Sequence, residues 1–425
     1  MKIQNANITL LGKARFASPI RHSVSDASRL PLNIIKAPGV KPPKQLFFEL
    51  AGPRQKLFFN PKTTRVGIVT CGGLCPGMNT VIRSAFLELH HTYGVKQVLG
   101  FRDGYQGLDP ASGLKPILLS SDLVDDIHKE GGTVLGTSRG PVDTGVAVDN
   151  LIKRGVDILF VVGGDGTQRG GREIFQEAQK RGHALAVVGI PKTVDNDVPF
   201  VSRTFGYQTA VEEAARVIAC AHTEVHSVKN GIAVVKLMGR HAGFIAADAT
   251  ISSQDVNFCL IPEISFKLEG SNGFLQALKK RTVNRAHAVI VVAEGAGQAL
   301  LDNQSAERDA SGNIKLRDIG TFLREKIDLY FRAEKIPVVL RYLDPSYIIR
   351  SVVAGSEDAI LCDQYARNAV HAAMAGKTGL VIGLLHDQFI HVPIELLSKQ
   401  QKRVDPDGPL WHAALATTGQ PLRFE

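Results

Sequence analysis

The stretch DILFVVGGDGTQRG, residues 157–170, places a continuous apolar run directly before three glycines that surround Asp165. Apolar runs of this length are typical of strands that are buried on both faces. Eight further runs of the same kind follow Arg65, with longer helical patterns between them. They are RVGIVT (65–70), QVLGF (97–101), LAVVGI (185–190), GIAVVKL (231–237), FCLIPE (258–263), AHAVIVVAEG (286–295), IPVVLRYL (336–343) and GLVIGLL (379–385).

This alternation of strands and helices predicts an α/β protein whose sheets are mostly parallel and carry helices on both faces. Nine strands are too many for one sheet unit, and 425 residues are enough for two domains, so we expect two Rossmann-like domains. The helix over 79–93 illustrates the pattern, since Asn79 can cap its start and Gly94 can end it.

The net charge of +9 lies in residues 1–64, which hold eleven Lys and Arg but only two acidic residues. The remainder is balanced and has no basic stripe of the kind that a duplex binder needs, so we expect no nucleic-acid partner. We interpret 1–64 as a basic N-terminal extension that is either a solvated arm or a subunit contact. Organelle targeting and nucleic-acid binding are the alternatives. The Pro-rich segment 37–45 is predicted to be a linker or extended arm.

The composition also excludes several classes of protein. No apolar run approaches the roughly 18–20 residues of a membrane-spanning helix, so no membrane association is expected. The five cysteines form no CxxC pair, and the start lacks a secretory apolar core, which together favour reduced thiols and a cytoplasmic location. Histidine pairs at 90–91 and at 222 and 226 lack a thiolate or carboxylate at ligand spacing, and this disfavours a metal site there.

Three loops stand where ligands bind in open α/β sheets, beyond the carboxyl ends of strands. TCGGLCPGMN (70–79) is a glycine-rich strand-to-helix turn, which suits either phosphate binding or close packing. In GGDGT (163–167), glycine amides can bind phosphate and Asp165 can hold Mg²⁺, although a plain turn is the alternative. GIPKTVDNDV (189–198) combines Asp195 and Asp197, which would project to the same side of an extended segment, with one lysine. Such a set suits proton removal from an alcohol beside a metal-bound phosphate, whereas Asn196 alone fits a turn.

These motifs, in this order, resemble the phosphofructokinase family, and the resemblance extends over residues 50–380. GGTVLGTSRGP (131–141) resembles the nucleotide-phosphate segment of that family. Three further stretches resemble the sugar-phosphate-binding segments of that family. They are KLMGRHAGFIAADA (236–249), VVAEGAG (291–297) and RYLDPSYIIR (341–350). The form of the first loop and AGPRQKLFF (51–59) are most similar to the plant and trypanosomatid ATP-dependent branch.

The resemblance implies phosphorylation of fructose 6-phosphate at its 1-hydroxyl by ATP and Mg²⁺, a step of glycolysis. It further implies a donor domain over 65–206, completed by part of 349–425, and a sugar-phosphate domain over 207–348, with the active site in the cleft between them. A homodimer or homotetramer is usual for the family.

The resemblance also assigns roles to individual residues. Asp195 is expected to be the general base, Lys192 a catalytic cation and Asp165 the metal ligand. The donor-phosphate contacts are expected to be Gly73, Arg139, Gly140, Gly164, Asp165, Gly166 and Thr167. The substrate contacts are expected to be Thr193, Val194, Asp195, Met238, Gly239, Arg240, Glu294, Arg341, Tyr347, Ile348, Ile349 and Arg350.

Two departures from short bacterial members bear on the sugar phosphate. Those enzymes have arginine where this chain has Gly231, which leaves open which subunit supplies the 6-phosphate contacts, and histidine where this chain has Tyr347. Gly166 favours ATP, because pyrophosphate users often carry aspartate there, whereas Lys192 is shared with those users. Pyrophosphate as donor therefore stays the main alternative. A noncatalytic regulatory subunit is disfavoured by the presence of Asp165 and Asp195, and a lipid or NAD kinase by the other segments.

Overall fold

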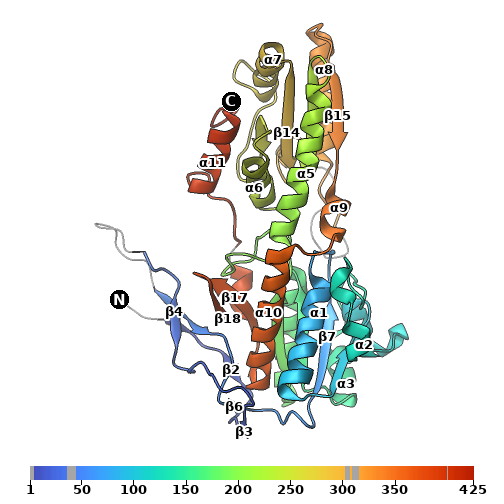
Figure 1. Cartoon of the computed structure of the whole chain (residues 1–425), viewed down its shortest axis with the longest axis vertical. Coiled ribbons are helices and arrows are strands. Elements are labelled where there is room, and N and C mark those ends of the chain that lie inside the picture. Colours follow the sequence, from blue (N-terminus) through green and yellow to red (C-terminus); the bar gives the residue numbers. More distant parts are fainter. Residues whose placement is uncertain (1–3, 36–44, 302–306, 309–314, 400) are drawn as a thin grey trace. The chain divides into compact units, whose positions relative to one another are not determined.

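A computed structural model of the chain describes residues 4–35, 45–301, 307–308, 315–399 and 401–425 (Figure 1). The chain divides into two units. The first contains residues 1–193, 198–206 and 352–401, and the second contains 194–197, 207–351 and 402–425. Among the described residues, no helix combines the length and the apolar character needed to cross a bilayer.

A large mixed sheet forms the centre of the first unit, in the order β1-β5-β18-β17-β11-β10-β7-β8-β9, and β4 pairs with β5. Its middle is parallel and consists of strands that were predicted from their apolar runs. They are β7 (Arg65–Thr70), β8 (Gln97–Gly100), β10 (Ile158–Gly163), β11 (Ala186–Pro191) and β17 (Leu380–Leu385). Every residue of β10 and β11 is buried, as expected for strands covered on both faces.

Helices cover both faces of this sheet. On one face, α3 (Thr144–Lys153) and α4 (Asp165–Lys180) share a core with β7 and β10. On the other, α1 (Met78–Leu87) and α10 (Ser356–Met374) lie side by side, and α10 packs on β11 and β17 (Figure 1). The short α2 (Ser121–Val124) contacts α1.

The N-terminal segment is built into this unit, so the expectation of a solvated arm is wrong for its described part. Strands β1 (Gln4–Ala6), β4 (Arg29–Pro31) and β5 (Leu46–Leu50) extend the large sheet through β18 (Gln388–Pro393). Two small antiparallel pairs join β2 (Thr9–Leu10) to β16 (Lys377–Thr378) and β3 (Phe16–Ala17) to β6 (Lys56–Leu57). Residues 36–44 of the predicted linker lie outside the described residues.

Buried charges bind this segment to the rest of the unit. Glu49 accepts from Arg54 Nη2 at 2.8 Å and from His391 Nδ1 at 2.9 Å, and its carboxylate lies 2.7 Å from Lys377 Nζ. Burial would raise the pKa of Glu49, but the hydrogen bonds and charges of His391 and Lys377 lower it far below its usual range. Burial also lowers the pKa of His391 to about 4. Glu49, one of the two acidic residues of the basic segment, therefore ties this segment to Lys377 and His391, which come from the C-terminal part of the first unit.

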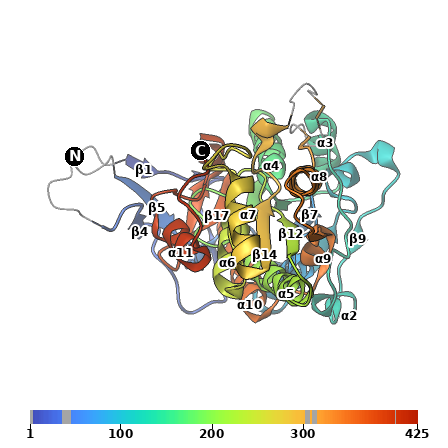
Figure 2. The same ribbon diagram turned by 90° about the horizontal axis from the view of Figure 1, so that it is seen from above.

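The second unit has a parallel four-stranded sheet in the order β13-β14-β12-β15. Its strands are β12 (Gly231–Leu237), β13 (Phe258–Leu260), β14 (His287–Ala293) and β15 (Val339–Leu343). One face packs on α7 (Phe274–Arg285) and α8 (Ile319–Ala333), and α5 (Tyr207–His226) and α6 (Phe244–Ser253) contact the same strands (Figure 2). The unit also contains α9 (Ser346–Ser351) and, from the end of the chain, α11 (Pro409–Thr418).

The start of α1 differs from its prediction. The helix begins after Gly77, which has φ 97°, and no side chain caps it. Asn79 instead accepts from the Val134 amide at 2.7 Å and donates to the Glu130 carbonyl at 3.2 Å, so it fixes the 130–134 loop. The predicted end is confirmed, because the π-helical turn η1 (Glu88–Tyr93) that continues α1 ends at Gly94 in the left-handed conformation.

Candidate active site

Four loops meet beyond the carboxyl ends of β7, β10 and β11 in the first unit. The Cys71 amide donates to Val162, and the Gly72 amide donates to Ser138 at 3.0 Å. In return, the Thr137 hydroxyl donates to the Gly72 carbonyl at 2.7 Å. Gly72 has φ 86°, a conformation that favours glycine. The structure thus brings Gly73 next to the loop that carries Arg139 and Gly140.

The GGDGT loop forms the N-terminus of α4. Gly164 precedes the helix, and Asp165 is exposed in its first turn. A Cβ atom at Gly163 would lie 2.4 Å from Thr167, so the loop closes only with glycine there. Buried Gln168 donates to the Gly163 carbonyl at 2.9 Å, and Tyr105 donates to the Thr167 carbonyl at 2.6 Å. These buried contacts hold the first amides of α4 toward solvent, where a helix N-terminus attracts anions.

Lys192 connects the third loop to the first. Its side chain is buried, and its ammonium group donates to the Gly73 carbonyl at 2.5 Å. Its amide donates to the Gly163 carbonyl at 3.1 Å. The predicted catalytic cation therefore lies beside both glycine loops.

Arg139 and Gly140 lie on the loop between the two glycine segments. Arg139 is exposed, and Gly140 adopts φ 120°, which a side chain would strain. Ser138 just before them donates to the Asp103 carbonyl at 2.6 Å. The Arg139 side chain is thus exposed, while hydrogen bonds of the preceding residue hold its backbone.

Asp195, the predicted general base, belongs to the second unit. Burial raises the pKa of Asp195 well above its usual range, and the carboxylates of Asp197 and Glu294 raise it further. Arg240 opposes this shift through a backbone hydrogen bond and its charge. Asn196 between the two aspartates has φ 53°, so the segment turns there, as the asparagine suggested. The pKa of this carboxyl is moved toward the range useful for a base at neutral pH.

The predicted sugar segments MGR and AEG contact each other. The Gly295 amide donates to the Gly239 carbonyl at 3.1 Å, and the Glu294 amide donates to Leu237 at 2.8 Å. A Cβ atom at Gly295 would lie 1.9 Å from the Arg240 carbonyl, so this approach requires glycine. Met238 is buried beside them. Burial raises the pKa of Glu294, and Arg240 and Lys236 oppose it.

The residues predicted for the 6-phosphate fall into two groups. Arg350 stacks over the Tyr347 ring at 4.6 Å, and its charge reaches Glu294. Arg341 on β15 instead donates to Glu224 of α5 at 2.9 Å. Tyr347 and Ile348 are exposed at 72% and 60%, whereas the Ile349 side chain is fully buried. Ile349 therefore anchors α9 in the core of the unit, and its side chain does not face a ligand.

Sequence reasoning missed two lysines of the second unit. The Lys402 amide donates to the Asp197 carbonyl at 3.3 Å, and its ammonium group lies 5.0 Å from the Phe244 ring centre. Burial lowers the pKa of Lys402 to about 8, against the charges of Asp197 and Asp248. No motif surrounds Lys402 in the sequence, so no local signal could have identified it.

Lys236 was quoted only as part of a sugar segment. Its ammonium group lies 2.8 Å from Asp344 and 3.3 Å from Asp318. Burial would lower the pKa of Lys236, but Asp344 outweighs it and raises the pKa above its usual range. The position of Lys236 near the end of β12, two residues before the MGR segment, was the available signal.

Comparison with known proteins gives one consistent family. Residues 65–373 match the family described as Phosphofructokinase. The chain is 49% identical over 388 residues to "ATP-dependent 6-phosphofructokinase" of Borreliella burgdorferi, covering 90% of this chain and 87% of that protein. It is 47% identical over 369 residues to the protein of the same name from Trypanosoma brucei brucei, covering 86% of this chain and 75% of that protein.

A solved structure supports the fold. The pyrophosphate-dependent phosphofructokinase of Marinobacter aquaeolei matches with a TM-score of 0.70 at 20% identity, over 85% of this chain and 93% of that one. The family match covers most of the chain, and the relatives named above are almost half identical to it. The chain belongs to the phosphofructokinase family.

Proposed function

We propose that the protein transfers the terminal phosphoryl group of ATP to the 1-hydroxyl of fructose 6-phosphate, giving fructose 1,6-bisphosphate and ADP. The observation that carries this proposal is the environment of Asp195, a buried carboxyl whose raised pKa suits a general base. The names of the relatives support the substrates, since those proteins are called ATP-dependent 6-phosphofructokinases at 41–49% identity.

On the acceptor side, Asp195 removes the proton from the sugar hydroxyl as the phosphorus–oxygen bond forms. Arg240 faces the Asp195 carboxyl and the negative charge that develops during phosphoryl transfer. Glu294 accepts hydrogen bonds from hydroxyl groups of the sugar. Arg350, supported by the Tyr347 ring, binds the 6-phosphate, for which a planar guanidinium is well suited. Within this unit Arg341 is occupied by Glu224, so its role at the phosphate requires that this pair opens or that it serves another subunit.

On the donor side, the amides of the glycine loops and of the first turn of α4 bind the phosphates. Lys192 and Arg139 add positive charge there. Asp195 lies three positions after Lys192 in the chain, so the backbone keeps their Cα atoms within about 11 Å of each other. The loop itself thus links the donor cation to the base.

Asp165 fits a magnesium ligand. Mg²⁺ in kinases is held by one or two carboxylates together with substrate phosphates, so it does not need a complete protein cage. The described residues contain no group of three or more His, Cys, Asp and Glu side chains placed to hold a metal, in agreement with such a shared site. An exposed aspartate at the start of α4, beside phosphate-binding amides, meets that requirement. When bound, the ion neutralises charge on the phosphate oxygens.

The choice of ATP over pyrophosphate rests on Gly166. A Cβ atom at this position would meet only the tip of Arg169, at 3.7 Å, so the space in front of it is open. An open position leaves room for the α-phosphate of a nucleotide, whereas a carboxylate there would repel it. We also propose that the protein is a homodimer or homotetramer, because a neighbouring subunit is then available to supply the second arginine contact to the 6-phosphate of the sugar.

One experiment tests both the reaction and the donor. Purified protein is assayed with fructose 6-phosphate and Mg²⁺, with ATP or pyrophosphate as donor in separate series, and fructose 1,6-bisphosphate is measured directly. We expect turnover with ATP to exceed turnover with pyrophosphate by at least about tenfold. Faster turnover with pyrophosphate contradicts the donor, and no turnover with either makes the chain a noncatalytic subunit.

A further inference from the structure

A cluster of charged side chains lies at the carboxyl end of the second unit's sheet, beside the predicted sugar segments. Lys236 of β12 is its centre. The ammonium group of Lys236 contacts Asp344, which follows β15, and Asp318, which precedes α8. Burial raises the pKa of the predicted sugar contact Glu294, and the charges of Lys236 and Asp344 also act on that pKa. None of the roles assigned above falls on Lys236, Asp344 or Asp318.

Lys236 ends an otherwise apolar row of side chains. Side chains two positions apart on a strand point to the same face, so Lys236 shares its face with Ile232 and Val234. Those two side chains are fully buried in the core that β12 forms with α7 and α8. A lysine at the end of such a row loses hydration, which costs free energy unless its charge is paired. The carboxylates around Lys236 meet that need.

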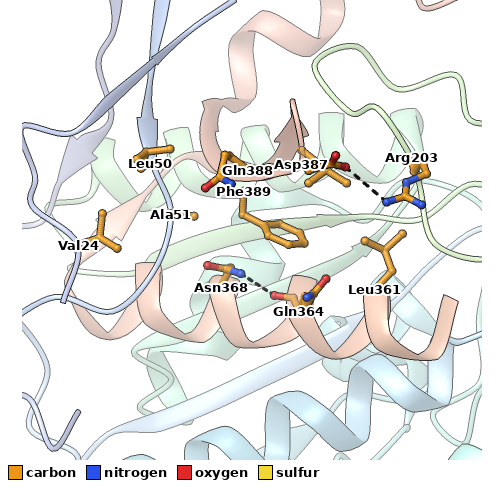
Figure 3. A pocket seen from close by; sticks show the side chains of 11 residues that line it. Val24, Leu50, Ala51, Arg203, Leu361, Gln364, Asn368, Asp387, Gln388 and Phe389 are labelled. Carbon is orange, nitrogen blue, oxygen red and sulfur yellow. Dashed lines mark hydrogen bonds and ion pairs between the residues drawn. The ribbon is translucent and has the colours of Figure 1, made fainter. Parts of the chain in front are cut away.

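The pairing of Lys236 differs from an ordinary surface ion pair. The Arg203–Asp387 pair of the first unit, drawn in Figure 3, spans 3.6 Å between side chains that are 45% and 86% exposed. The Lys236 side chain is 13% exposed, and its ammonium group lies 2.8 Å from Asp344. Exposed pairs contribute little because water screens them, whereas a mostly buried ammonium group depends on its partners. Lys236 therefore holds its carboxylates more firmly than a surface pair does.

Asp344 connects this contact to α9. One oxygen of its carboxylate faces Lys236, and the other accepts from the amide of Ser346 at 3.2 Å and from its hydroxyl at 2.5 Å. Ser346 is the first residue of α9. Burial would raise the pKa of Asp344, but the hydrogen bonds from Lys236 and Ser346 outweigh it and lower the pKa. The carboxylate is therefore charged, and both of its oxygens are used.

The helix α9 carries two of the residues predicted to contact the 6-phosphate, Tyr347 and Arg350, which stack at 4.6 Å. The buried side chain of Ile349 holds the helix in the core, and Asp344 holds its first residue. Arg341, the other predicted arginine, is occupied by an ion pair. Binding of the 6-phosphate within this unit therefore depends on where α9 lies.

Asp318 joins the start of α8 to the same ammonium group. Its carboxylate accepts from two backbone amides of α8 and from the Tyr342 hydroxyl at 3.1 Å. Asp318 and Asp344 both contact one nitrogen, so these carboxylate oxygens lie at most about 6 Å apart, a distance at which like charges repel. The charge of Lys236 offsets this repulsion.

We propose that Lys236 is a positioning residue for the phosphate of the sugar. It holds Asp344 and Asp318 together and so sets the start of α9. The places of Tyr347 and Arg350 on that helix follow from this contact. Without the ammonium group the two carboxylates move apart, and the first turn of α9 moves with Asp344. The inference rests on the proposed function, since it concerns the binding of fructose 6-phosphate.

The first test is direct binding of fructose 6-phosphate, measured by calorimetry on the full-length protein without a donor. Lys236→Met removes the charge but keeps a long side chain, and we expect it to weaken binding at least about fivefold, because small displacements of binding groups are costly. Binding of the nonhydrolysable ATP analogue AMP-PNP with Mg²⁺ should be unchanged, since the donor loops belong to the first unit. Lys279→Met is the matched control. Lys279 pairs with Glu334 at 2.6 Å in the same unit, and its loss should leave both affinities unchanged.

Asp344→Asn separates positioning from a simple loss of charge. The asparagine oxygen can still accept from Ser346, but its contact with Lys236 is weaker. Positioning predicts that this change alone weakens fructose 6-phosphate binding by about twofold or more. In combination with Lys236→Met it should instead restore affinity, because the uncompensated carboxylate is gone. Long-range charge alone predicts tighter binding of the anionic sugar with Asp344→Asn in both backgrounds.

Kinetics give a second readout. In Lys236→Met the KM for fructose 6-phosphate should rise while kcat stays within about twofold, the pattern of lost substrate binding. Unchanged fructose 6-phosphate binding in Lys236→Met, tighter binding in Asp344→Asn alone, or an equal loss in Lys279→Met each overturns the inference. If thermal unfolding shows that Lys236→Met does not fold, Asp344→Asn alone decides. A wild-type protein that binds no fructose 6-phosphate contradicts the proposed function itself, and the inference fails with it.

Discussion

The Thr204 hydroxyl donates a hydrogen bond to the backbone carbonyl of Thr193 across 2.7 Å, and so joins the end of the 193–204 loop to its start. Thr204 is completely buried. Asp195 lies two residues after Thr193, so its position depends on a threonine outside the motif that identified it.

We expect Thr204→Val to lower turnover by about tenfold to a hundredfold, because a small displacement of a catalytic group is costly. The unpaired Thr193 carbonyl should also lower the free energy of unfolding by about 1–3 kcal/mol. Thr378→Val is the control, since Thr378 is equally buried and donates to Leu185 at 3.0 Å. It should lose stability but keep its turnover, and equal turnover in both variants would contradict the role of Thr204.

Asp195→Asn should reduce turnover at least about 10²-fold, the scale of general-base catalysis, and change fructose 6-phosphate affinity much less. Asp328→Asn, on the exposed face of α8, is the control. Because the pKa of Asp195 is raised, the acid limb of the wild-type turnover should lie above the ordinary aspartate range and activity should fall as pH drops through it. Near-normal turnover of the asparagine variant would remove Asp195 from this role.

Gly166→Asp should strongly depress ATP-dependent turnover without loss of stability. The position is open, and an aspartate in the first turn of α4 suits the helix dipole. Lys192→Gly should lower the rate more than it lowers ATP affinity, because the ammonium group lies near the transferring group. Steady-state kinetics together with thermal unfolding separate these effects. A Gly166→Asp enzyme that uses ATP normally would argue against exclusion by charge.

Lys402 should act as a positioning residue whose charge is lost as pH rises through its pKa of about 8. Wild-type turnover is therefore expected to decline above about pH 8, and Lys402→Met should lack that decline while turning over more slowly at neutral pH. Lys326→Met on α8 is the control. The measurement is the full pH profile of kcat and KM, and an unchanged alkaline limb in Lys402→Met contradicts this assignment.

His391 should make stability depend on pH. Its folded pKa of about 4 lies below its unfolded value of about 6.5, so below pH 6.5 the unfolded chain binds a proton that the folded chain does not. Stability from this group is present above pH 6.5 and is lost toward pH 4, by about 3 kcal/mol in total. His391→Gln should flatten urea-unfolding stability over that interval. A slope equal to that of the wild-type protein would contradict the prediction.

The predicted strands formed because their apolar runs are uninterrupted, and that pattern needs no tertiary information. Strands β5 and β18 were missed because Glu49 and His391 interrupt their patterns, and these two residues satisfy each other only after the strands pair. Asn79 looked like a helix cap, but its side chain is used by a loop more than fifty residues later in the chain.

The three loop motifs were identified because phosphate chemistry requires glycine and aspartate at strand ends, which is visible in local sequence. Lys402 could not be found in this way, because the chain crosses from one unit to the other just before it. Similarly, Glu224 was not expected beside Arg341, since the pairing of a helix with a strand across 117 positions leaves no local pattern.

The pairing of β5 with β18 has a consequence for biosynthesis. A ribosome that has made residues 1–379 has supplied β5 and β11, but the two strands that lie between them in the sheet, β17 and β18, are not yet made. Until β17 emerges, β11 has an open edge, and until β18 emerges, β5 lacks its partner strand and Glu49 lacks His391. Open edges of this kind promote association between nascent chains. We therefore expect the first unit to complete its folding only near the end of translation, after the second unit's sheet can already form.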